Sequence, residues 1–271
     1  MKNDILFLKE KAKQIRKDVL NMLFKARSGH PGGSLSAVEI MITLYYEIMK
    51  YDPNNPRWPM RDRFILSKGH AAPTLYSILA DIGIIEKDKL LSLRKLGSPL
   101  QGHPSHKAIQ GIEASTGSLG HGLSIGNGIA LAGRIDRRDY MVWILLGDGE
   151  LQEGQVWEAA MSAGHYRLYN VCAIVDKNGF QIDGSTTEIK DIDPLADKFR
   201  AFKWDIVQVN GHNFNELAVA MEFARLNKRR PTAIIAHTIK GKGISFMENK
   251  LEFHGRAPTE EELKWALLQL K

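Results

Sequence analysis

Apolar positions along the chain follow two spacings, one typical of helices and one typical of buried strands. Apolar residues three and four positions apart predict amphipathic helices over residues 6–26, 36–49, 71–82, 123–134, 156–164, 194–202, 213–227 and 259–271. Apolar runs predict strands over residues 63–67, 141–146, 171–175, 205–209 and 232–237. Strands and helices that alternate in this way predict an α/β fold, a parallel sheet with helices on both faces.

Two connections stand apart from this regular pattern. Ser36 is followed three residues later by Glu39, the spacing of a capping box, so we expect a helix to begin there and residues 28–33 to form a loop. Residues 97–122 show little periodicity and many Gly, Ser, Pro and His residues. Connections of this length inside compact domains are usually functional.

Length and composition are those of an ordinary soluble protein. The chain has 271 residues, of which 44% are hydrophobic and 25% charged, and no segment resembles a linker or an internal repeat. We therefore predict a single domain over residues 1–271. The longest uncharged apolar run, residues 140–146, is far shorter than the ~20 residues that a membrane span needs. We expect no membrane association and, without a secretory pattern at the start, a cytoplasmic location.

The net charge of +6 raises the question of a nucleic-acid partner. Residues 1–30 contain eight Lys/Arg and three acids, a net charge of +5, so the rest of the chain is nearly neutral. A basic face on one helix without a nucleic-acid motif is most often a solvated or partner-facing surface, and we expect no nucleic-acid partner. The single cysteine, Cys172, excludes an internal disulfide and a cysteine-clustered zinc site.

Histidine placement is the first sign of a site. Six of the nine histidines directly follow a glycine, namely His30, His70, His103, His121, His165 and His212. Glycine permits tight turns and close backbone approach, so the repetition suggests that several imidazoles are presented from loops around a shared site.

Polar loops follow two of the predicted strands. The strand at 141–146 runs into Gly147-Asp148-Gly149-Glu150, and the strand at 171–175 runs into Asp176-Lys177-Asn178-Gly179-Phe180. Ligands of open parallel sheets bind at the carboxyl ends of the strands. The oxygens of Asp148 and Asn178 suit Mg²⁺ or Ca²⁺ better than zinc, and a following helix N-terminus favours a diphosphate.

These motifs and their order along the chain resemble transketolase. The resemblance rests on the two loops above, on Ser28-Gly29-His30-Pro31-Gly32, Phe64 to His70, Gly102-His103-Pro104, Thr116 to Gly120, Lys240 to Gly243 and His254-Gly255. It implies a thiamine diphosphate-binding fold and the cofactors thiamine diphosphate and Mg²⁺, with Ca²⁺ as a possible substitute. Its activity would be transfer of a two-carbon ketol unit from a ketose phosphate to an aldose phosphate.

The resemblance also assigns roles to residues. It makes Asp148, Asn178 and the carbonyl of Phe180 the metal ligands, and Lys68, His70, Gly149, Lys240 and His254 diphosphate contacts. Segment Gly117, Ser118 and Leu119 would lie against the cofactor rings, with Ile182 packed on the thiazolium. The residues expected at the reacting carbon are His30, His70, His103 and His254, and Glu153 would lie at a subunit contact that links two active sites. His121 departs from the family pattern and receives no role.

The same resemblance predicts a partner. The family's carboxylate that protonates the aminopyrimidine belongs to a second, pyrimidine-binding domain, and nothing after residue 258 supplies it. We therefore expect the diphosphate-binding N-terminal subunit of a split transketolase, which works with a C-terminal, pyrimidine-binding subunit in a heterotetramer of two copies of each and acts on sugar phosphates.

Three alternatives remain open from the sequence. One is another thiamine diphosphate enzyme, of the 2-oxo-acid dehydrogenase or deoxyxylulose phosphate synthase type, although those generally lack the full set of four histidines. The second is a basic nucleic-acid-binding module, whose binding would fall steeply with salt. The third is a zinc hydrolase built on His103 and His106, an incomplete ligand set by itself.

Overall fold

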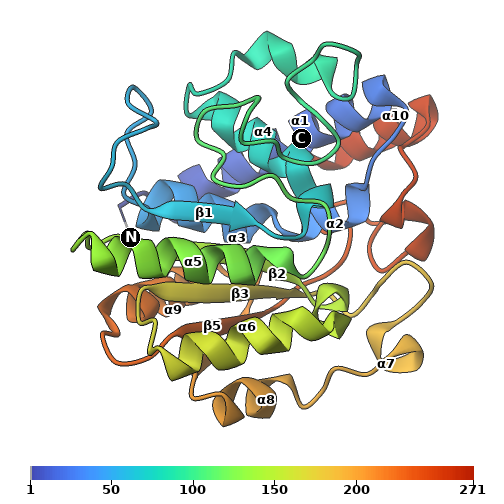
Figure 1. Cartoon of the computed structure of the whole chain (residues 1–271). Helices are drawn as coiled ribbons and strands as arrows, with labels where there is room; N and C mark the ends of the chain where they lie inside the picture. Colours follow the sequence, from blue (N-terminus) through green and yellow to red (C-terminus); the bar gives the residue numbers. More distant parts are fainter. Residues whose placement is uncertain (1) are drawn as a thin grey trace.

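The five strands form one parallel sheet. The computed structural model describes residues 2–271, and in it the strand order is β1-β2-β3-β5-β4 (Figure 1). The strands are β1 (Arg63–Leu66), β2 (Val142–Gly147), β3 (Val171–Lys177), β4 (Asp205–Asn210) and β5 (Thr232–His237). Four of them are almost wholly buried, as their apolar runs require. The predicted α/β fold with a parallel sheet is confirmed.

Helices cover both faces of the sheet. One apolar core packs the face formed by Phe64, Trp143 and Cys172 against one group of helices, and a second core packs the opposite face, with Val142, against another. The first group is α1 (Ile5–Ala26), α2 (Pro31–Ser36), α3 (Val38–Ile42), α4 (Ala72–Asp81), α9 (Phe214–Leu226) and α10 (Glu260–Gln269). The second group is α5 (His121–Ile135), α6 (Gly154–His165) and α8 (Leu195–Ala201). Figure 1 shows α5 and α6 in front of the sheet.

The capping box expected at Ser36 and Glu39 is wrong. Helix begins already at Pro31, and Ser36 ends α2 instead of starting a helix. The Ser36 hydroxyl donates to Asp176 Oδ2 at 2.6 Å, so a buried acceptor on β3 competes successfully for it. Residues 31–33 are therefore helical and not loop. The capping box of this chain lies at the start of α10, between Thr259 and Glu262.

Short elements join the main ones. A single turn of α helix, α7 (Thr186–Ile189), lies between β3 and α8, and a π-helical turn, Thr43–Ile48, continues α3. Turns of 3₁₀ helix are found at Gly69–Ala71, Lys87–Ser92, Gly149–Gln152 and Leu251–His254. The segment from residue 97 to 120 contains no helix or strand. None of the helices within residues 2–271 is long and apolar enough to cross a bilayer.

Candidate active site

The loops at the carboxyl ends of β1, β2, β3 and β5 surround one cleft of about 330 Å³. Pairing of Gly147 on β2 with Asp176 on β3 brings the two polar loops side by side. The cleft is lined by almost every residue that the sequence nominated, namely His30, Lys68, His70, His103, Gly117, Leu119, Asp148, Gly149, Glu153, Asn178, Phe180, Ile182, Lys240 and His254. Ser118 is exposed and does not line it.

Asp148 is a buried carboxylate whose hydrogen bonds come from backbone amides. Its Oδ1 accepts a hydrogen bond from Gly149 N at 2.9 Å and its Oδ2 one from Gly179 N at 2.5 Å. Burial, followed by the nearby charge of Asp176, raises its pKa to about 6. A carboxylate in this situation gains from a bound cation, because the cation restores the electrostatic stabilisation that burial removed.

Oxygens for such a cation come from the next loop. Asn178 is buried, and its side-chain oxygen accepts a hydrogen bond from Phe180 N at 3.2 Å. The carbonyl of Phe180 accepts one from Lys240 Nζ at 3.2 Å, so an ammonium group lies beside this oxygen. One carboxylate, one amide and one carbonyl are hard donors that fit Mg²⁺ when phosphate oxygens complete its shell. Within residues 2–271 no cluster of three or more His, Cys, Asp or Glu offers an alternative metal site.

A buried ion pair forms the floor of the cleft. Lys68 Nζ lies 2.5 Å from Asp176 Oδ2 and donates to the carbonyl of Gly33 at 2.9 Å. Asp176 also accepts hydrogen bonds from Ser36 and Thr238. Burial opposes ionisation of Asp176, but Lys68 and these hydrogen bonds outweigh it and lower the pKa. The ammonium of Lys68 is thus fixed beneath the space that an anionic ligand would enter.

Three imidazoles meet at one side of the cleft. The ring centroids of His30 and His70 are 5.2 Å apart, those of His30 and His254 5.5 Å, and those of His70 and His254 5.8 Å. Helix α2 permits this approach, because a Cβ on Gly33 would lie 2.9 Å from His70 Nε2. His254 Nδ1 lies 2.7 Å from Lys240 Nζ.

Burial keeps these rings neutral. It lowers the pKa of His30 to about 4, with a further contribution from Arg94, and lowers the pKa of His254 to about 3, with a contribution from Lys240. The pKa of His70 falls well below its usual value for the same reason, with Lys68 next in importance. Burial, then Lys68, also lowers the pKa of Lys240 to about 8. Neutral imidazoles can accept protons as well as donate hydrogen bonds.

His103 approaches from the long segment over residues 97–120. Gly117 has φ +137°, and a Cβ there would lie 2.8 Å from His103 Cγ. Both the backbone conformation and the lack of space therefore require glycine at this position. Burial and then the charge of Arg94 lower the pKa of His103. Arg94 donates to the Ser28 hydroxyl at 2.9 Å, which holds the guanidinium beside this histidine.

Sequence reasoning missed several residues that hold the site together. Glu150 accepts hydrogen bonds from Gly147 N at 3.0 Å and Gly120 N at 2.9 Å and one from the Ser67 hydroxyl, so it joins three loops. Asp176 and Arg94 were also not assigned. Asp176 directly precedes the Lys177-Asn178 pair at the end of a buried strand, and that position was the available signal. Arg94 gave none, because only the folded chain brings its guanidinium close to His103 and Ser28.

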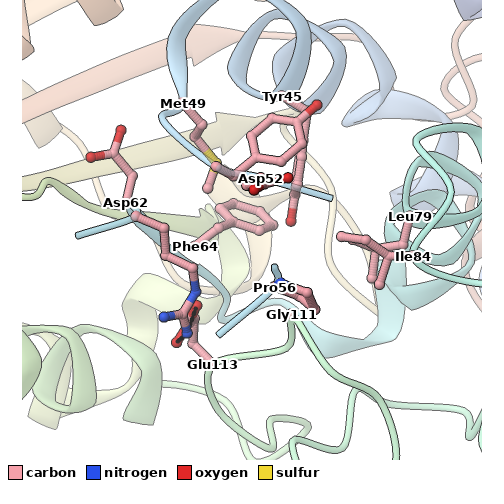
Figure 2. A pocket seen from close by; sticks show the side chains of 12 residues that line it. Tyr45, Met49, Asp52, Pro56, Asp62, Phe64, Leu79, Ile84, Gly111 and Glu113 are labelled. Atoms are coloured by element: carbon pink, nitrogen blue, oxygen red, sulfur yellow. Dashed lines mark hydrogen bonds and ion pairs between the residues drawn. The ribbon is translucent and has the colours of Figure 1, made fainter. Parts of the chain in front are cut away.

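A second pocket lies beside the start of β1, away from the cleft (Figure 2). Figure 2 shows the Phe64 ring directed into it next to Tyr45, and Arg61 donates to Glu113 at 2.7 and 2.8 Å on its border. Its volume of about 20 Å³ leaves room for about one water molecule. The structure does not support a zinc hydrolase built on His103 and His106. His106 does not line the cleft, and its Nδ1 lies 3.0 Å from the Ser115 hydroxyl.

Comparison with known proteins decides the family. A family model described as the thiamine diphosphate binding domain of transketolase matches residues 8–270. The chain belongs to the transketolase family. Within this family it is 45% identical to the 6-deoxy-6-sulfo-D-fructose transketolase subunit SqwG of Clostridium sp. (strain MSTE9), over 97% of this chain and 96% of that protein.

Other transketolases divide into short and long relatives. An apulose-4-phosphate transketolase subunit of Phocaeicola vulgatus is 39% identical over 94% of this chain and 90% of its own length. Human transketolase is 43% identical over 92% of this chain, which spans only 40% of the human protein. The crystal structure of Campylobacter jejuni transketolase superposes with a TM-score of 0.92 at 34% identity, over 99% of this chain and 43% of that one. The predicted resemblance and the thiamine diphosphate-binding fold are confirmed.

Proposed function

We propose that this transketolase-family chain is the diphosphate-binding subunit of a two-chain transketolase, which transfers a two-carbon ketol unit from a ketose phosphate to an aldose phosphate. The observation that carries the proposal is the cleft itself, which is lined by buried Asp148 and Asn178 and by neutral histidines that adjoin two ammonium groups. The two short relatives described above are named as subunits, and this chain spans 96% and 90% of their lengths, which supports the two-chain arrangement.

Thiamine diphosphate and Mg²⁺ are the proposed ligands of the cleft. Asp148, Asn178 and the Phe180 carbonyl would hold the metal, with Ca²⁺ an acceptable substitute because its oxygen ligands are the same. Lys68, His70, Gly149, Lys240 and His254 would bind the diphosphate, the lysines through charge-assisted hydrogen bonds. Gly117, Leu119 and Ile182, which line the cleft, would lie against the organic rings, and Ser118 would contribute only through its place in the same segment. When bound, thiamine diphosphate supplies the electron sink that cleavage beside a carbonyl requires.

The chain's own contribution to chemistry is proton handling. His30, His70, His103 and His254 are neutral near pH 7 by the pKa shifts above, so each presents an unprotonated nitrogen and a ring N–H to the hydroxyls of a sugar. A donor N–H from the same rings can stabilise negative charge that develops on a sugar oxygen. Lys68 and Asp176 form a buried ion pair under the cleft, where the low local dielectric strengthens electrostatic interactions.

We propose that the missing part of the active site is a pyrimidine-binding domain on a second chain, in a heterotetramer of two copies of each. Ile182 lines the cleft yet is 68% exposed, and Glu153 at the rim is exposed as well. Both are suited to contact with another subunit, and Glu153 would lie where two active sites communicate. Residues that select the sugar would belong mainly to the partner. We place the assembled enzyme in the cytoplasm.

The test is to co-express this chain with a candidate pyrimidine-binding chain and assay ketol transfer between sugar phosphates with thiamine diphosphate and Mg²⁺. Activity should require both chains. Asp148→Asn should weaken Mg²⁺-dependent cofactor binding at least a hundredfold, because it removes the only carboxylate among the three proposed metal ligands. Asp183→Asn, at an exposed position of the same cleft, is the matched control and should change binding less than twofold.

Two outcomes would contradict the proposal. Full thiamine-dependent ketol transfer by this chain alone would exclude the need for a partner. Turnover of pyruvate without turnover of pentose phosphates would instead favour a 2-oxo-acid dehydrogenase or deoxyxylulose phosphate synthase type of reaction.

A further inference from the structure

A broad groove lies at the end of the sheet opposite to the cleft. It has a volume of about 920 Å³ and lies near the amino ends of β3, β4 and β5. Its lining comes from the ends of α5 and α6 and from the loops that enter these three strands: Arg134, Gly164, His165, Arg167, Tyr169, Lys203, Lys228, Arg229 and Arg230. We call it the basic groove.

Charge in the basic groove is of one sign. Six of its nine lining residues are Lys or Arg, and none is Asp or Glu. Among residues 2–271 only one of the six, Lys228, has an ion-pair partner, Asp139 at 3.1 Å. Arg167, Lys203, Arg229 and Arg230 make no ion pair within the described chain. Cations that gather without counter-charges repel one another, and an anion bound between them relieves that repulsion.

The groove is also held in shape. Arg134 donates to the carbonyl of Tyr166 at 2.7 Å, and the charged groups of Arg134 and Lys228 lie 5.6 and 5.4 Å from the ring centre of Tyr169. On the other side buried Asn227 accepts a hydrogen bond from Arg229 N at 3.1 Å and donates to the carbonyl of Arg230 at 3.2 Å. These contacts fix the backbone under the cations, so less ordering is needed when an anion binds.

We propose that the basic groove binds a soluble anion that carries several phosphate groups. Its cations come from four separate segments, which matches several charges spread over one ligand better than a single phosphate. The two aromatic rings that line the groove already have neighbours, because Tyr169 has Arg134 and Lys228 close to its ring and His165 packs edge-to-face on Tyr166, so the groove is a poorer stacking platform for the bases of a nucleic acid than a binding site for phosphates. Within the described chain no large aliphatic or tryptophan side chain lines it, unlike the centre of a protein interface.

The basic groove is independent of the proposed catalytic site. Strand β3 separates the two, with Tyr169 before it and Asn178 directly after it. Seven residues of strand at about 3.3 Å each put more than ~20 Å between them. The inference therefore neither uses nor needs thiamine diphosphate, and it stands or falls separately from the transketolase proposal.

The test is calorimetric titration of the purified 271-residue chain with inorganic tripolyphosphate at 150 mM salt. We expect saturable binding that the double variant Arg167→Gln/Arg230→Gln weakens at least tenfold. The control, Lys9→Gln/Lys25→Gln, removes the same two charges from exposed positions on α1 and should change affinity less than twofold. A parallel titration with ATP identifies the source of the phosphates: equal affinity indicates a bare phosphate chain and tighter binding of ATP a nucleotide, and both support the proposal.

Four results would overturn it. They are absence of saturable binding, equal weakening in both double variants, affinity for single-stranded RNA that increases with its length, and loss of binding in Lys240→Gln with retention in the groove variant. The last result would mean that tripolyphosphate occupies the catalytic cleft instead.

Discussion

Glu39 fixes the tautomer of His212. Because His212 Nε2 accepts the backbone N–H of Ile239 at 2.8 Å, the proton of the neutral ring is on Nδ1, which donates to Glu39 Oε2 at 2.9 Å. Arg16 completes the arrangement: its NH1 lies 2.8 Å from Glu39 Oε1 and its Nε donates to the carbonyl of Lys242 at 2.8 Å. Arg16 on α1 and Glu39 on α3 thus fix the loop that carries Lys240 on both of its sides. Arg16 bonds Lys242 directly, and Glu39 acts on Ile239 through His212.

His212 is therefore expected to act as a positioning residue for Lys240. Replacing it, His212→Ala, leaves the Ile239 N–H without an acceptor, and we expect the affinity of the assembled enzyme for thiamine diphosphate to fall about tenfold, or about 1.4 kcal/mol. Since His212 does not line the cleft, kcat at saturating cofactor should stay within twofold. His212→Gln, which can accept and donate, should recover most of the affinity. A loss of kcat without loss of affinity would contradict the positioning role.

Removing one charge of the Lys68–Asp176 ion pair should lower the free energy of unfolding more than removing both charges. Lys68→Met leaves a buried carboxylate unpaired and should lower the free energy of unfolding by about 3–5 kcal/mol. The double variant Lys68→Met/Asp176→Asn removes that charge while keeping an acceptor for Ser36, so it should recover at least half of the loss. Urea unfolding of the cofactor-free chain measures both. Equal destabilisation of the single and double variants would show that the lysine contributes through packing and not through charge.

The histidine cluster predicts that the cofactor-free chain loses stability in mild acid. In the unfolded chain these histidines bind protons as the pH falls through 6.5, whereas His30 in the fold binds one only near about 4 and His254 only near about 3. Between pH 6.5 and 4 the unfolded state holds more protons, so the free energy of unfolding decreases as the pH falls. Each of the two contributes a slope of about 1.4 kcal/mol per pH unit.

Urea unfolding at pH 7.5, 6.0 and 5.0 tests this slope. His30→Gln should reduce it by about 1.4 kcal/mol per pH unit, whereas His165→Gln, at an exposed position on α6, should leave it unchanged. A free energy of unfolding that stays constant from pH 6.5 to 5.0 would mean that the imidazoles protonate without cost in the fold.

Two helical glycines predict opposite responses to the same substitution. A Cβ on Gly164, in α6, would lie 1.8 Å from the carbonyl oxygen of Phe202, so Gly164→Ala should destabilise by about 2–3 kcal/mol. A Cβ on Gly128, in α5, would meet nothing within 4 Å, so Gly128→Ala should stabilise by about 0.5–1 kcal/mol. Thermal and urea unfolding should agree in sign, and a neutral Gly164→Ala would show that the helix can shift away from Phe202.

Much of the fold was predictable because its sheet is buried on both faces. Runs such as Val142–Gly147 and Val171–Lys177 have few polar positions, and this pattern together with the intervening helices specifies parallel order. The start of the second helix was not predictable. Nothing local reveals that Ser36 bonds to Asp176, 140 residues away, so the capping-box pattern with Glu39 was misleading.

The candidate site likewise contains residues that the sequence could predict and residues that it could not. Asp148 and Asn178 could be nominated because each directly follows a buried strand, and the repeated Gly-His pairs nominated His30, His70 and His103. The groups that fix these side chains come from distant segments. Arg94 is held beside His103 by its bond to Ser28, 66 residues away in the chain, and Glu150 joins loops that only the folded chain brings together. Such contacts depend on tertiary structure, and local sequence patterns do not contain them.

The exposure of Ile182 bears on how water reaches the cleft. A large aliphatic side chain, 68% exposed at the rim of a charged cleft, means that water reaches the proposed reaction centre freely while this chain is alone. Proton transfers among sugar hydroxyls and neutral imidazoles are selective only when bulk water is kept out. Association with another subunit would then do more than add missing groups. It would also exclude water and so prevent hydrolysis and side reactions. An unassembled chain would then be inactive.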